Sequence, residues 1–143
     1  MFKGEYQHTL DAKGRVIIPS RLRVNLGDCF VVTRGLDHCI FVYPLTEWDV
    51  MEEKLKKLPL TKKNTRAFSR LMLSGAMEVE VDGQGRVLIP QYLREHAGIE
   101  RDMMIVGVGS RVEIWDEEKW KSYYVEADSN YEQLAEEMDE YEL

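Results

Sequence analysis

The sequence predicts a mixed α+β fold made of two copies of one small unit. Two observations lead to this prediction: an internal repeat that spans most of the chain, and, within each repeat, an alternating strand pattern followed by helical spacing. The chain has 143 residues, of which 44% are hydrophobic, enough for one compact domain or two small units that share a core. Each copy alone is too small to bury a substantial core, so we expect the two copies to interlock or to pair across chains.

The repeat is clearest where the segment DAKGRVIIPSRLRVNLG at residues 11–27 returns as DGQGRVLIPQYLREHAG at residues 82–98. Nine of the 17 positions are identical, including a glycine, an arginine and a proline in register. Weaker similarity continues through residues 29–48 and 103–120. We therefore expect the two halves to fold alike.

The sequence pattern of each copy predicts the element order β-β-α-β-β-α. The alternating segments EYQHTL and MEVEV predict the first strands. Tight turns follow at residues 11–14 and 82–85, because an aspartate there can accept hydrogen bonds from nearby backbone N–H groups and a glycine tolerates positive φ. The return strands RVIIP and RVLIP end at Pro19 and Pro90, and each proline can begin a short helix.

The later elements of each copy carry helix-end signals. Gly27 and Gly98 fit the position just beyond the short helices. Two more strands follow, and then a longer helix. Thr46 with Asp49 predicts a capping box for the long helix of the first copy, and Asp116 predicts a cap for that of the second.

Two further helices are expected outside the repeated elements. Thr61 is the expected cap of a connecting helix that carries Phe68, Leu71 and Met72 on one side, and Ser129 is the expected cap of an acidic, amphipathic tail helix. The expected division of the chain is the first repeat at 5–47, the connecting helices at 48–75, the second repeat at 76–119 and the acidic helical tail at 120–143.

The charge of the chain is unevenly divided. The net charge is −7, but residues 1–75 hold 13 Lys+Arg against 8 Asp+Glu, whereas residues 76–143 hold 6 against 18. An acidic total argues against a general nucleic-acid coat, and it is compatible with a local basic surface. The apolar runs are too short to span a membrane and the N-terminal residues do not resemble a signal peptide, so we expect a cytoplasmic protein with no membrane partner.

Catalytic and metal-binding motifs are sparse. The three histidines lie in no nucleophile motif or metal-spaced cluster, and Cys29 and Cys39 lack the spacing of a zinc site. The glycine-rich segments lack the lysine of a phosphate loop. The sequence therefore predicts a protein that is not an enzyme and that has no cofactor, no metal and no small-molecule substrate.

The segments DAKGRVIIPSRLR and DGQGRVLIPQYLR resemble the looped-hinge, swapped-hairpin DNA-binding domain of the AbrB/SpoVT superfamily. Two tandem copies in a chain of this length, with the further segments GEYQHTLDAKGR, YPLTEW and LPLTKK, resemble the MraZ family over essentially the whole chain. The resemblance implies an α+β fold of two pseudo-symmetric swapped-hairpin units, AbrB-like and double-psi-like β-barrels with short helices, assembled into a homo-oligomeric ring.

The resemblance also implies a function. Members of the MraZ family are bacterial transcriptional regulators associated with the division and cell-wall gene cluster. For this chain, the resemblance implies sequence-specific binding to short direct repeats in the promoter of its own operon, generally as a repressor. Its expected partners are promoter DNA and further copies of itself, and its expected location is the cytoplasm, in association with the nucleoid.

The residues that would contact DNA lie in and after the two turns. A two-stranded ribbon fits the major groove, and the guanidinium groups of Arg15 and Arg86 can bond guanine or phosphate at two points. The other candidate DNA-binding residues are Lys13, Gln84, Arg21, Arg23 and Arg94. The candidate turn-forming residues are Asp11, Gly14, Asp82 and Gly85.

Other interpretations stay open. Arg15 with Asp11, and Arg86 with Asp82, could be ion pairs that only stabilise the turns. The same fold could also serve as an antitoxin-like or scaffold module for protein interaction, with the acidic tail as its contact, although two full copies of the fold count against this. The copies also differ in their cations, so it is open whether both contact DNA equally.

Overall fold

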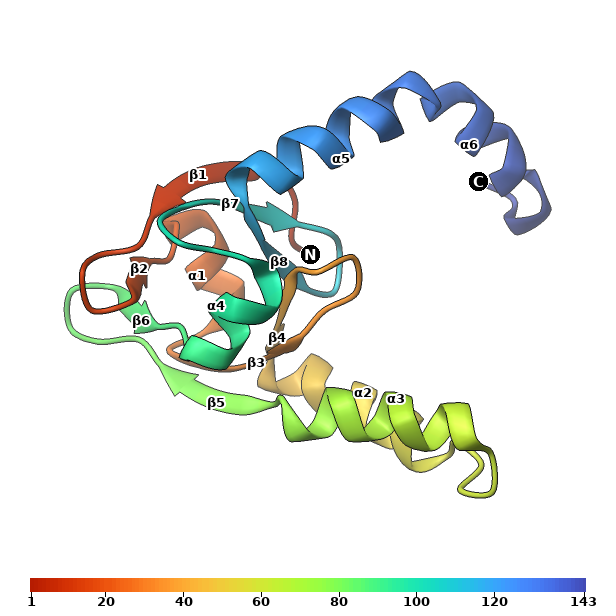
Figure 1. Cartoon of the computed structure of the whole chain (residues 1–143), viewed down its shortest axis with the longest axis horizontal. Helices are drawn as coiled ribbons and strands as arrows, with labels where there is room; N and C mark the ends of the chain where they lie inside the picture. The colour runs from red at the N-terminus through yellow and green to blue at the C-terminus, as the bar shows by residue number, and fades with distance from the viewer.

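The structure, a computed structural model, describes residues 1–143 and consists of strands and short helices in the predicted order (Figure 1). The strands are β1 (Glu5–Thr9), β2 (Arg15–Ile17), β3 (Cys29–Arg34), β4 (Ile40–Pro44), β5 (Met77–Glu80), β6 (Arg86–Leu88), β7 (Asp102–Gly107) and β8 (Val112–Asp116). The helices are α1 (Ser20–Leu26), α2 (Leu45–Lys56), α3 (Lys63–Ser74), α4 (Gln91–Ala97), α5 (Glu117–Ser129) and α6 (Tyr131–Glu137), followed by a 3-10 turn at Met138–Tyr141. None of these helices combines the length and apolar character that crossing a bilayer requires.

The two halves of the chain exchange strands. β1 from the first half pairs with β7 from the second, and β5 from the second half pairs with β3 from the first. These strands belong to one antiparallel sheet of order β1-β7-β8-β4-β3-β5, while β2 and β6 form a separate two-stranded ribbon. The halves therefore interlock within one chain, which is one of the two arrangements that the small size of each copy predicts.

A single apolar core joins the two halves. Val16 and Val87 face each other at the centre of the β2–β6 ribbon, and both are buried. Leu22 of α1 and Leu93 of α4 are buried in the same cluster of 20 residues, which draws on both halves. Because burying one such side chain contributes about 1.5–3 kcal/mol, neither half could lose its partner without losing much of its stability.

A second apolar cluster attaches α2 and α3 to the outer face of the sheet. Trp48 and Leu55 of α2 pack there with Met72 of α3 and Trp115 of β8. The buried hydroxyl of Thr33 donates a hydrogen bond to the Met72 carbonyl oxygen at 2.6 Å, which ties α3 to β3. This cluster fixes the direction in which α2 and α3 leave the sheet.

The molecule has two distinct ends. The connections β1–β2 and β5–β6 lie close together at one end, and the α2–α3 pair and the α5–α6 pair extend from the other (Figure 1). No residue of α5 or α6 is buried. The turns are thus held by the shared core, whereas α5 and α6 are attached to the sheet only through the N-terminal part of α5.

The capping box predicted at Thr46 and Asp49 is wrong. α2 begins at Leu45, directly after Pro44 ends β4, and no side chain caps it. Because the strand leads straight into the helix, Thr46 and Asp49 already lie within the helix, where neither side chain can act as an N-cap.

Of the other predicted caps, one is confirmed and two are wrong. Asp116 accepts a hydrogen bond from the Lys119 N–H at 3.1 Å, as a cap of α5 should. α3 begins at Lys63 without a side-chain cap, so Thr61 does not cap it. Ser129 ends α5 instead of starting α6, and its hydroxyl donates to the carbonyl oxygen of Glu126.

Candidate nucleic-acid interface

The first candidate turn is organised by one carboxylate. Oδ1 of Asp11 accepts hydrogen bonds from the backbone N–H groups of Lys13 and Arg15, both at 2.9 Å. Gly14 lies between them with φ of +80°, a conformation that residues with a side chain seldom adopt. The turn therefore places the Lys13 side chain at its exposed tip and starts β2 at Arg15.

The second turn repeats this geometry. Oδ1 of Asp82 accepts hydrogen bonds from the N–H groups of Gln84 and Arg86, again both at 2.9 Å, and Gly85 also has φ of +80°. The two turns form one unit, because the Ile18 N–H donates to the Gly85 carbonyl oxygen at 3.1 Å. The candidate residues of both copies are therefore brought to one end of the molecule.

The arginines that follow the glycines are held in a defined direction. Nε of Arg15 donates to Oδ2 of Asp11 at 2.8 Å, and Nε of Arg86 donates to Oδ2 of Asp82 at the same distance. No hydrogen bond within the chain engages the Nη groups of either arginine. Each ion pair therefore positions a guanidinium while leaving its outer donors available, so a turn-stabilising role and a binding role are compatible.

One face of the β2–β6 ribbon carries these arginines together with two apolar side chains. The register pairs Arg15 with Leu88 and Ile17 with Arg86, on the face opposite the buried valines. Ile17 is 52% exposed and Leu88 is 55% exposed. We call these four side chains the outer ribbon face. Its two apolar members, Ile17 and Leu88, are not among the residues that the sequence predicts for the interface, although the alternation in RVI and RVL is a signal that could have identified them.

The arginines of the short helices reach across to the turn of the other copy. A Cβ at Gly14 would lie 3.0 Å from Cζ of Arg94, and a Cβ at Gly85 would lie 2.6 Å from Nη1 of Arg23. Arg94 also donates from Nε to the Ile89 carbonyl oxygen at 3.1 Å. Each glycine thus provides space for a guanidinium from the opposite half, and four arginines gather around the ribbon.

The two copies differ at the edges of this surface. Lys13 and Gln84 occupy equivalent exposed positions, so only the first turn carries a cation at its tip. Arg21 is exposed on α1, whereas its counterpart Tyr92 donates a hydrogen bond to the Gly75 carbonyl oxygen at 2.8 Å. The structure brings Arg21 into no polar contact with the other candidate residues, and the first copy is the more basic.

The turn carboxylates are stabilised in their ionised form. The backbone N–H of Arg15 is the largest cause that lowers the pKa of Asp11, and the guanidinium of the same residue lowers this pKa further. Arg86 lowers the pKa of Asp82 in the same way. Both carboxylates are therefore charged at neutral pH, and they hold the arginines throughout the physiological range.

The histidine, cysteine, aspartate and glutamate side chains do not gather into a second, metal-binding site. No group of three or more histidine, cysteine, aspartate or glutamate side chains is placed to hold a metal ion. Cys29 and Cys39 are both free thiols, and burial raises the pKa of the Cys39 thiol well above its usual range, which makes it unreactive.

Comparison with known proteins identifies the family. A family model described as "MraZ protein, putative antitoxin-like" matches the chain twice, over residues 1–71 and 72–141. A protein of Natranaerobius thermophilus named "Transcriptional regulator MraZ" is 55% identical over 143 residues, which is 100% of both chains.

Other relatives are equally similar. Proteins of the same name from Thermoanaerobacter pseudethanolicus and Lactobacillus delbrueckii subsp. bulgaricus are 58% identical over 140 residues and 55% identical over 143, covering 98% and 100% of each chain. A solution structure from Pyrococcus horikoshii, 19% identical over 80% of this chain and 88% of its own, aligns with a TM-score of only 0.32. The two family matches and the full-length relatives show that this chain belongs to the MraZ family.

Proposed function

We propose that this protein is a sequence-specific DNA-binding transcriptional regulator without catalytic activity. The name of its relatives, "Transcriptional regulator MraZ", supports the proposal at the level of the family. The observation that carries it for this chain is the outer ribbon face, where Arg15 and Arg86 present free Nη groups in orientations that Asp11 and Asp82 restrain.

The chemistry of this face fits the major groove of DNA. A two-stranded ribbon can enter that groove, and an arginine can bond the O6 and N7 atoms of guanine at two points. Ile17 and Leu88 share the face with the arginines and are about half exposed, so they would contact thymine methyl groups in such a complex. Lys13, Arg21, Arg23 and Arg94 would contact phosphates, which fixes position without reading sequence, and Gln84 would bond a base edge or a phosphate.

Several copies acting together would supply the affinity that one ribbon lacks. The chain is acidic overall, and phosphate contacts weaken with salt, so a single ribbon should bind weakly in cells. A homo-oligomeric ring that faces several direct repeats gains roughly 10²–10⁴ in avidity through effective concentration. We therefore propose that the protein binds short direct repeats in the promoter of its own operon, in the division and cell-wall gene cluster, as a repressor at the nucleoid.

A second candidate function is a module for protein interaction. The family description includes the term "antitoxin-like", and the C-terminal helices contribute no residue to the core. The free Nη groups on the ribbon favour DNA over this alternative. Copurification of an unrelated protein, together with no shift of promoter DNA, would favour the alternative instead.

The decisive test is the variant Arg15→Ala in a gel shift with the DNA upstream of the protein's own gene. Losing one two-point contact costs about 1–3 kcal/mol per ribbon, and this loss is multiplied over several repeats, so we expect binding to be abolished while the oligomer persists. Lys121→Ala, which removes a cation from α5 at the other end of the molecule, is the matched control. Full-strength binding by Arg15→Ala would refute the proposal.

A further inference from the structure

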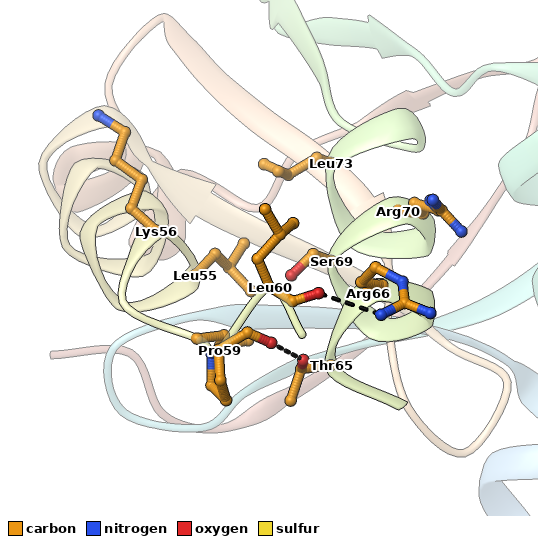
Figure 2. Close-up of a pocket in the computed structure, with 10 residues that line it drawn as sticks. Leu55, Lys56, Pro59, Leu60, Thr65, Arg66, Ser69, Arg70 and Leu73 are labelled. Atoms are coloured by element: carbon orange, nitrogen blue, oxygen red, sulfur yellow. Dashed lines mark hydrogen bonds between the residues drawn. The ribbon is translucent and has the colours of Figure 1, made fainter. Parts of the chain in front are cut away.

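Two cavities lie on different faces of α3. In the first, between α2 and α3, Thr65 and Arg66 use their side chains to hold the loop between the helices, by donating hydrogen bonds to its carbonyl oxygens (Figure 2). The second has a volume of about 530 Å³ and lies where α3 meets the β3–β4 turn and α4. We call it the α3–α4 pocket, and the main side chains that line it are Arg34, Leu36, His38, Phe68, Leu71 and His96.

Arg34 is fixed in this pocket with part of its guanidinium free. Nη1 donates hydrogen bonds to the Leu71 carbonyl oxygen at 2.9 Å and to the Ser74 hydroxyl at 3.2 Å. The guanidinium also lies over the Tyr92 ring, with Cζ 5.6 Å from the ring centre. No hydrogen bond within the chain engages Nε or Nη2. The pocket therefore contains a positioned cation whose remaining donors can bond the oxygen atoms of an anion.

Two imidazoles lie beside this arginine in the same pocket. Nε2 of His96 is 3.0 Å from the Gly35 carbonyl oxygen, and because a carbonyl oxygen only accepts, Nε2 carries a proton. Nδ1 of His96 is then left without a partner in the chain. The ring centre of His38 lies 5.8 Å from that of His96, and no hydrogen bond within the chain engages His38. Nitrogen atoms from both halves of the chain thus converge on one cavity.

The turn that carries His38 has a costly backbone conformation. Asp37 has φ of +61° and His38 has φ of +58°, and a hairpin turn of this kind usually contains glycine or asparagine. Backbone strain of this sort is common at functional sites, where it places a side chain that the site requires. Asp37 is exposed and is the one acid that lines the pocket. The strained turn therefore brings an imidazole to the pocket at a conformational cost.

The polar residues of the pocket are not shared by the two copies. Arg34 corresponds to Val108 in the second copy, and His96 corresponds to Asn25 in the first. Since both copies form the same elements, the repeated fold does not require an arginine or a histidine at these positions. The bonds of Nη1 give Arg34 a role in holding α3, but they do not account for the free donors that gather around the cavity.

Apolar side chains complete the walls. Leu36 is 57% exposed and Leu71 is 58% exposed, and Phe68 is also partly open to solvent. The volume is within the range of about 300–1,000 Å³ that is usual for small-molecule sites, which combine apolar walls with a few converging polar groups. DNA is disfavoured as the occupant, because the β3–β4 turn lies away from the β1–β2 and β5–β6 connections (Figure 1).

We propose that the α3–α4 pocket binds a small organic anion. The carboxylate or phosphate group of this ligand bonds the guanidinium of Arg34 and the imidazoles of His38 and His96. Its apolar body packs against Phe68 and Leu71. This site is separate from the outer ribbon face, and the inference does not depend on DNA binding.

The test uses the full-length protein with ¹³C-labelled methionine methyl groups, and 1-naphthyl phosphate and 1-naphthoate as probes. Met72 lines the pocket, and its methyl signal is identified by its loss in Met72→Leu. 1-Naphthol lacks the anionic group, and inorganic phosphate lacks the apolar body, so these two compounds test each half of the proposed ligand. Titrations followed by NMR give the affinity of each compound.

Two variants remove pocket donors. Arg34→Gln removes the guanidinium, and His38→Asn removes an imidazole while keeping a residue type that tolerates positive φ. Arg101→Gln, which removes an exposed cation that does not line the pocket, is the matched control. Circular dichroism checks that each variant is folded, and if Arg34→Gln does not fold, His38→Asn decides the test.

We expect both naphthyl anions to shift the Met72 signal in a saturable way. Arg34→Gln should weaken their binding about tenfold or more, because a hydrogen bond between charged groups is lost. His38→Asn should weaken it several-fold, and Arg101→Gln should bind like the unmodified protein. 1-Naphthol and inorganic phosphate should each bind more weakly than the naphthyl anions.

Three results would overturn the inference. The first is a Met72 signal that neither anion shifts at millimolar concentration, as when another copy of the chain covers the pocket. The second is equal binding of 1-naphthol or of inorganic phosphate, since the site would then not recognise an organic anion. The third is unchanged affinity in a folded Arg34→Gln or His38→Asn variant, which would place the bound probe elsewhere. The gel shift with promoter DNA measures the proposed function separately.

Discussion

At the scale of single residues, Gly14 meets two constraints that no other amino-acid type could meet together at this position. Its φ is +80°, and a Cβ there would lie 3.0 Å from Cζ of Arg94. We expect Gly14→Ala to lower the free energy of unfolding by about 1–2 kcal/mol, the usual cost of a side chain in this conformation. Urea denaturation measures the change.

Gly83→Ala is the matched control for this prediction. No heavy atom lies within 4 Å of the position of its Cβ, and the first copy carries Ala12 at the equivalent place. We expect the control to be neutral or slightly stabilising, because alanine restricts the unfolded chain. Equal losses in the two variants would show that the turn is not constrained as described.

The sequence predicts the conformation and hydrogen bonds of a single residue well where they depend only on its neighbours in the chain. The hydrogen bonds of Asp11 and the positive φ of Gly14 follow from the known preferences of these residue types within five consecutive positions. The approach of Arg94 to Gly14 could not be predicted in this way, because it depends on which strands of the two copies pair. The DNA contacts themselves stay a prediction.

At the scale of elements, strand exchange makes each half depend on the other. Residues 1–75 contain β1 without its partner β7, and β3 without β5, one of its two neighbours in the sheet. We therefore expect a fragment of residues 1–75 to be unfolded or self-associated, and an equimolar mixture with residues 76–143 to recover the fold. Circular dichroism and gel filtration measure this. A monomeric fragment with its own cooperative unfolding transition would contradict the prediction.

The element order was predictable because the repeat allows each copy to support the assignment in the other. The residues at which the helices begin were less predictable. Thr46 and Thr61 have the residue type of a cap, but α2 follows directly from a strand that ends at Pro44, and α3 begins after a loop held by Thr65. The strand that leads directly into α2, and the hydrogen bonds of Thr65 in the loop before α3, decide where these two helices begin, and the residue type at Thr46 or Thr61 does not. The division of the chain into domains stays a prediction.

At the scale of the whole molecule, the affinity for DNA should depend steeply on salt, because each phosphate contact releases a counterion. We expect Lys13→Ala to reduce the slope of log K against log salt concentration by about 1 for each ribbon that binds. Ile17→Ala should weaken binding with the slope unchanged, since it removes no charge. Titrations by fluorescence anisotropy at several salt concentrations measure both. A flat salt dependence of the unmodified protein would count against phosphate contacts.

Covalent linkage of the two copies also gives the ribbon polarity. Two identical chains that paired in this way would form a two-fold symmetric ribbon, and such a ribbon would match an inverted-repeat DNA site. Here one strand of the pair is flanked by Lys13 and the other by Gln84, and α1 carries Arg21 where α4 carries Tyr92. A duplex lying across this ribbon would meet a different neighbour on each side, so its two orientations are inequivalent. An asymmetric binding surface of this kind can distinguish direct repeats, which all have the same orientation, from inverted repeats.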